Sequence, residues 1–188
     1  MTLKSKIYGA AAGLALAFVA TASSAATCGT SPSLDTSNVV ITSLGTGNVN
    51  IAATDCAGKF SGNDTGNKGT LLTNLNGEMF TGLKDEWSIY GKSGKGGTVT
   101  AVKAKTGEWS VDFLTNAFSV FAVSLKGAND YVVYLFDLRP GSALTVDGTF
   151  KTLGLLNKGG NVPNLSHMTI AVYDAPVSPV PLPAAGWL

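Results

Sequence analysis

FSVFAVSL (Phe118 to Leu125) and YVVYLFDL (Tyr131 to Leu138) are two apolar runs separated by the short polar segment KGAND. In an extended chain successive side chains point to opposite faces, and in both runs apolar residues occupy both faces. Strands of this kind are usually central in a sheet and covered on both sides. Lys126 to Asp130 has the composition of a turn. The stretch therefore predicts a hairpin of two central strands.

Further strands are predicted where apolar residues recur at every second position. Trp109, Val111 and Phe113 alternate with polar residues, which predicts a strand with one solvent-exposed face. A second alternating strand is predicted at Met168 to Val172. Four weaker candidates for strands are Asn38 to Leu44, Asn48 to Ala52, Trp87 to Tyr90 and Val99 to Ala104. We expect the following core side chains to be buried on facing sheets: Trp109, Val111, Phe113, Val120, Val133, Leu135, Ile170 and Val172.

No long helix is predicted after residue 26. Apolar residues do not keep a helical period for three turns, and glycine or proline interrupts the chain at Gly141, Gly148 and Pro163. Many short strands with turn signals between them favour an all-β fold, an antiparallel β-sandwich or a jelly-roll-like domain. Trp87 and Trp109 are expected to fill its core; the alternative is that they stack on sugar rings.

The N-terminus has the three-part pattern of a secretory signal peptide. Lys4 and Lys6 precede the apolar segment Ile7 to Ala20, and small residues follow, with cleavage expected after Ala25 or Ala26. The apolar segment is shorter than the roughly 20 residues that a membrane-spanning helix needs, which disfavours an uncleaved anchor. Residues 1–26 are therefore predicted to be removed on export.

The chain that remains is almost neutral. Without residues 1–26 it keeps 11 of the 13 basic side chains against 12 acidic ones. Arg139 is the only arginine, and the lysines are scattered among acidic residues. A nucleic-acid-binding domain would carry a clustered basic face, so we expect no nucleic-acid partner.

Cys28 and Cys56 are the only cysteines, and both lie in the part of the chain expected to be exported. An even number of cysteines in an exported chain most often forms disulfides. The chain-entropy model gives such a bond roughly 3.5 kcal/mol. The alternative, a metal site or a reactive thiol, lacks partners, because the single histidine, His167, is distant in the sequence. A Cys28–Cys56 disulfide is predicted.

Few residues are candidates for a catalytic or binding site, and we predict no catalytic, cofactor or metal site. Ser166 and His167 are adjacent, but neighbours on a strand point to opposite faces, so adjacency alone does not make a nucleophile and its base. We favour the interpretation in which His167 is a polar residue of a strand face or turn.

Two groups of oxygen-bearing residues are candidate sites. The glycine-rich segment with Asp55, Ser61, Asn63, Asp64, Thr65 and Asn67 lacks the order of acids of an EF-hand. An ordinary solvated loop is favoured over a Ca²⁺ site. Glu78, Asp85, Glu86 and Glu108 could supply the carboxylate pair of a sugar hydrolase, but acids are common at strand edges.

The C-terminus carries a sorting-like motif. Ala175 to Pro179 has the composition of a short extended linker, and Val180-Pro181-Leu182-Pro183-Ala184 follows it. This motif resembles the VPLPA variant of the PEP-CTERM sorting signal, which exosortases of Gram-negative bacteria recognise. Because proline lacks an N–H donor, we expect the motif to be extended and exposed. In that family an apolar helix closed by arginines follows, so the reading frame is expected to continue past Leu188 into such a run.

The second half of the chain is similar to exported PEP-CTERM domains. The similarity is carried by FAVSLKGAN from Phe121, YLFD from Tyr134, LLNKGGN from Leu155 and LSH from Leu165. The resemblance implies a β-rich protein that is sorted through the inner membrane and is released or attached at the cell surface. Such proteins are associated with exopolysaccharide and the biofilm matrix.

Three segments result: a signal peptide at 1–26, a β-sandwich domain at 27–174, and a proline-rich linker with the start of the sorting signal at 175–188. The expected function is that of a non-enzymatic structural protein of the cell surface or extracellular matrix. The alternatives are a non-catalytic carbohydrate-binding module and a hydrolase. Expected partners are signal peptidase, an exosortase-type enzyme and exopolysaccharide, with transient inner-membrane association through the expected C-terminal helix. No cofactor is expected.

Overall fold

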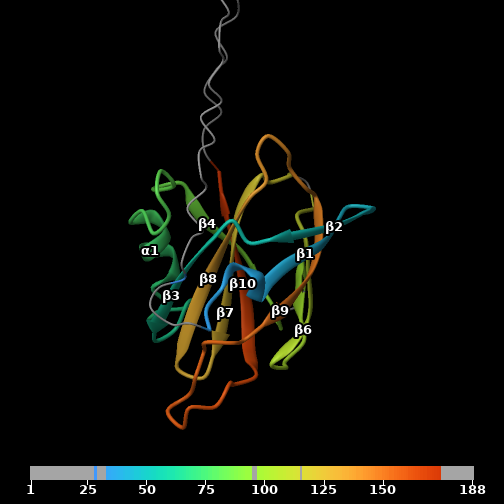
Figure 1. Ribbon diagram of the computed structural model, residues 1–188. Coiled ribbons are helices and arrows are strands. Elements are labelled where there is room, and N and C mark those ends of the chain that lie inside the picture. Colours follow the sequence, from blue (N-terminus) through green and yellow to red (C-terminus); the bar gives the residue numbers. More distant parts are fainter. Residues whose placement is uncertain (1–27, 29–32, 95–96, 115, 175–188) are drawn as a thin grey trace, which may run out of the picture.

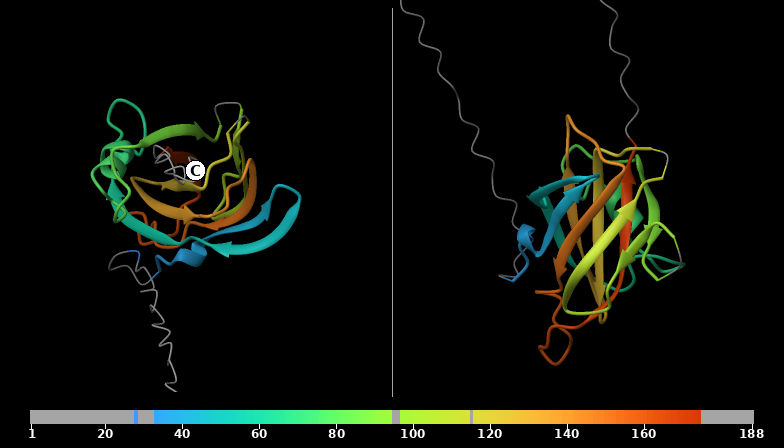
Figure 2. Two further views of the ribbon diagram at one scale, coloured as in Figure 1. Left: turned by 90° about the horizontal axis from the view of Figure 1, so that it is seen from above. Right: turned by 90° about the vertical axis from the view of Figure 1, so that its right-hand side faces the viewer.

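The computed structural model describes residue 28 and residues 33–94, 97–114 and 116–174. Within these residues, ten strands form two antiparallel sheets of five strands each, which pack face to face (Figures 1 and 2). The predicted all-β sandwich is confirmed.

The strands are short, and each sheet mixes strands from distant parts of the chain. Sheet A consists, in spatial order, of β2 (Gly47–Ala52), β1 (Val39–Leu44), β9 (Thr145–Lys151), β6 (Thr106–Asp112) and β5 (Val99–Ala101). Sheet B consists of β3 (Asp55–Ser61), β8 (Asp130–Asp137), β7 (Val120–Gly127), β10 (Leu165–Tyr173) and β4 (Trp87–Lys92). The helical elements are η1 (Thr36–Asn38) and α1 (Leu71–Asn76).

The predicted hairpin is β7 and β8. These strands pair from Val120–Asp137 to Gly127–Asp130, which leaves Ala128 and Asn129 as the loop. Neither strand is at the edge of sheet B, because β7 also pairs with β10 and β8 with β3. The prediction that both strands are central is therefore confirmed.

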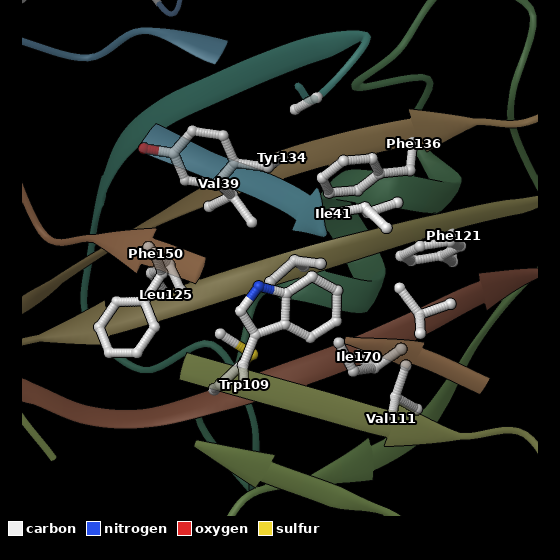
Figure 3. Close-up of a cluster of buried hydrophobic side chains, with 14 of the residues drawn as sticks. Val39, Ile41, Trp109, Val111, Phe121, Leu125, Tyr134, Phe136, Phe150 and Ile170 are labelled. Atoms are coloured by element: carbon white, nitrogen blue, oxygen red, sulfur yellow. The ribbon is translucent and has the colours of Figure 1, made fainter. Parts of the chain in front are cut away.

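The inner core lies between the two sheets. Sheet A contributes Trp109 and Val111, and sheet B contributes the stacked pair Phe121 and Phe136, whose ring centroids lie 5.2 Å apart (Figure 3). Trp109 is 2% exposed, and its indole N–H donates to the carbonyl of Thr149. The expectation that this tryptophan fills the core is confirmed.

The outer core lies on the other face of sheet B. Helix α1 and the connection to β4 cover this face with Leu71, Leu75, Phe80 and Leu83, which cluster with Trp87 at the start of β4. All eight predicted core residues are buried, but the location predicted for three of them was wrong. Val120, Val133 and Leu135 face the outer core rather than sheet A, because both faces of β7 and β8 are apolar and the pattern alone does not say which face meets the second sheet.

Strands β3 and β9 and helix α1 were not predicted. In β9 the inward positions are Val146, Gly148 and Phe150, so a glycine interrupts the apolar alternation. A Cβ at Gly148 would lie 2.5 Å from Nε1 of Trp109 and 2.3 Å from the carbonyl oxygen of Val40. The large indole ring thus explains why the facing position of the neighbouring strand has no side chain.

The Cys28–Cys56 disulfide is present, with a Cα–Cα distance of 4.7 Å, within the range that the bond requires. Both cysteines are buried and belong to the inner core. The bond fastens the chain ahead of β1 to β3 at the edge of sheet B.

The predicted cleavage region at Ala25 and Ala26 and the sorting motif Val180 to Ala184 lie outside the described residues. Among the residues that are described, no helix has both the length and the apolar character needed to cross a membrane.

Trp109 provides a test of the inner core. Trp109→Ala should lower the free energy of unfolding by roughly 3–5 kcal/mol, because the indole leaves a large cavity between the sheets. Urea denaturation followed by circular dichroism measures the change. The matched control is Thr149→Ala on the exposed face of β9, expected to change stability by less than about 1 kcal/mol. An equally small effect of both substitutions would contradict the assignment.

Candidate functional site

The outer face of sheet B has a polar half beside the outer core. Ser124 on β7 lies directly opposite Thr169 on β10, and Lys126 lies opposite His167 in the same pair of strands. Asp64, from the loop between β3 and α1, lies over these four residues, and we call the five residues the Asp64 cluster. Asp64 is only 2% exposed, which is unusual for a carboxylate.

The carboxylate of Asp64 is saturated with hydrogen bonds. Nε2 of His167 lies 2.7 Å from Oδ1, so this nitrogen carries the shared proton. The hydroxyls of Thr169 and Ser124 donate to Oδ2 at 2.8 Å and 3.2 Å. Two sheet strands and one loop are thus joined at a single side chain.

The loop that carries Asp64 is closed by its own backbone. The carbonyl of Asp64 accepts from Leu71 N at 3.0 Å, and the carbonyl of Asn63 accepts from Thr70 N at 3.1 Å. At the start of α1, the Tyr131 hydroxyl bonds to Thr70 at 2.8 Å and accepts from Asn74 at 2.9 Å. The loop and the helix therefore dock on sheet B as one unit.

The electrostatics of the cluster favour an ionised Asp64. Burial alone would raise the pKa of this carboxyl, but the hydrogen bonds from His167 and Thr169 and the charges of His167 and Lys92 outweigh burial and lower it. Lys92 also donates to the hydroxyl of Thr65 at 3.0 Å, beside Asp64 in the loop.

Lys126 is the second buried charge of the cluster. Its ammonium group donates to the carbonyl of Ala128 at 2.7 Å, within the β7–β8 turn. Burial lowers the pKa of Lys126, and the charges of Asp64 and Asp130 oppose that shift.

This arrangement holds the loop in place and lacks the geometry of a nucleophilic triad. In a triad the base contacts the nucleophile and the acid orients the base. Here His167 and Ser124 both contact the carboxylate, and Ser124 is fully buried. Ser166, the other serine considered, is exposed on the surface of β10.

This cluster corrects one sequence-based interpretation and confirms another. The expectation of an ordinary solvated loop was wrong for Asp64, because its side chain points into the sheet. His167 is a polar residue of a strand face, on β10, as expected, and its hydrogen bond to Asp64 joins residues that are 103 positions apart in the chain. The other oxygen-bearing residues of this segment do not join the cluster. For example, Asp55 accepts from Cys56 N at the start of β3, and Ser61 donates to Asp130.

The only sequence signal for the cluster was the polar interruption of an apolar strand pattern. Ser124 and Lys126 occupy outward positions of β7, and Thr169 does so on β10. A hydroxyl in a strand that is covered on both sides needs a partner from the covering layer. That the partner would be Asp64 could not be read from the sequence.

The exposed face of sheet A carries an open polar groove with a volume of about 800 Å³. An adjoining hollow of about 640 Å³ shares Thr100, Ser110 and Asp147 with it, so the two form one continuous feature, the sheet A groove. Polar side chains from four strands belong to its lining: Thr42, Asn48, Glu108 and Thr149. Thr100 and Ser110 hydrogen-bond to each other at 2.7 Å.

The acids considered for hydrolysis do not gather in one place. Glu78, Asp85 and Glu86 lie between α1 and β4, beside sheet B, whereas Glu108 lies on β6 in sheet A. Glu108 faces Thr149 across the β6–β9 pair, so Asp147 is its diagonal neighbour on an open sheet face. Carboxylates placed in this way flank no enclosed cleft.

The groove offers no exposed aromatic ring, although Trp109 is among its lining residues. Trp87 and Trp109 are both buried, and within the described residues the exposed large hydrophobic side chains are aliphatic. The sugar-stacking interpretation of the two tryptophans was therefore wrong.

No protein-family model matches the chain, and neither the curated proteins nor the solved structures contain a match. Within the described part of the chain, no three His, Cys, Asp or Glu side chains are grouped so that they could hold a metal ion.

The Asp64 cluster predicts a dependence of stability on pH. The folded-state pKa of Asp64 is lowered, so its contribution is present above the ordinary carboxyl pKa of about 4 and is lost as the pH falls through the folded value. Asp64→Asn should therefore destabilise the protein by roughly 1.5–3 kcal/mol at pH 7, and the difference from wild type should shrink at pH 3.

Urea midpoints of both proteins at the two pH values measure this difference. Asp147→Asn is the matched control, because Asp147 is exposed on sheet A, and it should leave the midpoints unchanged. A stability difference for Asp64→Asn that stays constant between pH 7 and pH 3 would show that ionisation of Asp64 is not the cause.

Proposed function

We propose that the chain is exported and serves as a structural protein of the cell surface or extracellular matrix, processed at the VPLPA-type motif. The observation that carries the proposal is the Cys28–Cys56 disulfide, which forms directly after the predicted signal peptide. Structural disulfides persist in oxidising compartments, outside the cytoplasm. The sorting-like motif Val180 to Ala184 begins a few residues after β10 ends at Tyr173.

The buried polar groups support a structural role over catalysis. In the Asp64 cluster the donors and the acceptor satisfy one another, and their result is a fixed loop. Catalytic groups need access to a substrate, whereas Asp64 and Ser124 are closed off from solvent.

The sorting step can be tested by deletion in the producing bacterium, in the complete reading frame. Deleting Val180 to Ala184 should leave the protein in the membrane fraction, because a processing enzyme needs this extended, proline-containing backbone as its substrate. Deleting Ala175 to Pro179, a segment of the same length, is the control and should preserve release to the surface or matrix. Fractionation and immunoblotting measure both. Normal processing after loss of the motif would contradict the proposal.

A second candidate function is non-catalytic carbohydrate binding at the sheet A groove. The observation that favours it is the lining of the groove, whose hydroxyl, amide and carboxylate groups are the donors and acceptors that sugar hydroxyls can match. The lack of an exposed aromatic platform in the described residues predicts weak binding to an extended chain rather than tight binding to one sugar.

Glycan-array screening followed by titration calorimetry tests this candidate. Asp147→Ala should weaken binding of any glycan found by roughly tenfold, because Asp147 lies where the two parts of the groove meet. Glu86→Ala, an exposed acid beside sheet B, should leave binding unchanged. Binding that survives Asp147→Ala, or an array without any bound glycan, would exclude the groove as a glycan site.

A further inference from the structure

The lysines are scattered along the sequence, but the fold gathers them at one end of the sandwich. This basic end consists of the connections from β3 to α1, β5 to β6, β7 to β8 and β9 to β10, with the strand ends beside them (Figure 1). Every described lysine except Lys84 lies there: Lys59, Lys68, Lys92, Lys103, Lys105, Lys126, Lys151 and Lys158. Lys126 is buried and Lys92 is half-buried, whereas the other six are exposed.

Hydrogen bonds join the connections of the basic end into one surface. Thr152 N donates to the carbonyl of Lys105 at 2.8 Å, which ties the β9–β10 connection to the β5–β6 turn. Nζ of Lys59, on β3, donates to the carbonyl of Leu156 in the same connection at 3.0 Å. Lys59 and Lys158 also line a shared hollow of about 270 Å³. The lysines of different segments therefore face solvent side by side.

The carboxylates are concentrated at the opposite end, around the end of β10 and the start of β4. Those that are exposed or half-buried there are Glu78, Asp85, Glu86, Asp112, Asp137 and Asp174. At the basic end Asp64 is buried, and Asp130 is paired with Lys59 at 3.0 Å. The exposed acids beside it are Asp35, ahead of β1, and Glu108 on β6. A chain that is almost neutral overall thus has one positively charged end.

Exposed apolar side chains stand among these lysines. Leu153 and Leu156 are 41% and 40% exposed, and Val102, beside the β5–β6 turn, is 48% exposed. Leu155, between the two leucines, is 1% exposed and belongs to the inner core. Because Leu155 anchors the β9–β10 connection, its two leucine neighbours are held at the surface. The basic end therefore presents ammonium groups and aliphatic side chains together.

We propose that the basic end docks on the surface of an anionic lipid bilayer. The lysines lie at the level of the headgroup phosphates, and Leu153 and Leu156 reach the boundary between headgroups and acyl chains. Lysines near an anionic bilayer are attracted by its negative surface potential, and aliphatic side chains gain by leaving water at that boundary. A bilayer surface is a partner that matches both kinds of side chain at once.

The composition of the basic end disfavours other anionic partners. A soluble acidic polymer would match the lysines but would leave the leucines in water. Proteins that bind single-stranded nucleic acid stack its bases on aromatic rings, and within the described residues no large aromatic side chain is exposed. The opposite end also exposes two leucines, Leu114 and Leu144, but among carboxylates, which an anionic surface repels.

This inference goes beyond the proposed function and does not rest on it, because vesicle binding does not require the sorting motif. The full chain, purified after export to a bacterial periplasm, should co-sediment with vesicles of phosphatidylcholine and phosphatidylglycerol but not with phosphatidylcholine alone. Binding should weaken as salt is added, because ions screen the lysines. Lys158→Glu should lower the partition coefficient at least about fivefold. Lys84→Glu, at the opposite end, is the matched control and should leave it unchanged.

The leucines separate a bilayer from a soluble polyanion as the partner. Leu153→Ser combined with Leu156→Ser should lower binding to the anionic vesicles about tenfold, because their apolar contact with the bilayer is lost. Leu114→Ser combined with Leu144→Ser is the control and should bind as the wild type does. Circular dichroism checks that each variant is folded. Absence of binding to anionic vesicles would overturn the proposal. So would an equal loss from Lys84→Glu, or full binding without Leu153 and Leu156, which would point to a soluble polyanion.

Discussion

The burial of sheet B on both faces is the constraint on which the rest of the structure depends. Because β7 and β8 are apolar on both faces, one facing sheet cannot remove all of their surface from water. Sheet A covers one face, so the chain between β3 and β4 has to cover the other. A six-residue helix would not be stable alone, and α1 forms because Leu71 and Leu75 are buried on that sheet.

The Asp64 cluster determines where this second cover lies. An apolar layer alone could shift over the sheet at little cost, whereas a carboxylate has to meet its donors. Burying the charge costs several kcal/mol, and charge-assisted hydrogen bonds from His167, Ser124 and Thr169 return a similar amount. The net gain in stability is therefore small, and the larger effect of Asp64 is that it selects one position for the loop and α1.

The features that could be predicted from the sequence are those that depend on residues near one another in the chain or on composition. The β7–β8 hairpin, the alternation around Trp109 and the cysteine pair are local or compositional patterns, and the structure confirms them. Strand β9 was missed because Gly148, which makes room for the Trp109 ring, interrupts its alternation. The face that Val120 and Leu135 would occupy, and the contact between Asp64 and His167, depend on how distant segments pack, which no local pattern records.

The low charge of the chain is reflected in two surface features, the sheet A groove and the edge strand β2. Sheet A meets water mainly through hydroxyl, amide and scattered carboxylate groups, and the same composition leaves β2 without the lysine that protects an edge. Asn48 belongs to both features, since it lines the sheet A groove and stands on the free edge. A ligand in the sheet A groove would therefore also contact the edge strand β2.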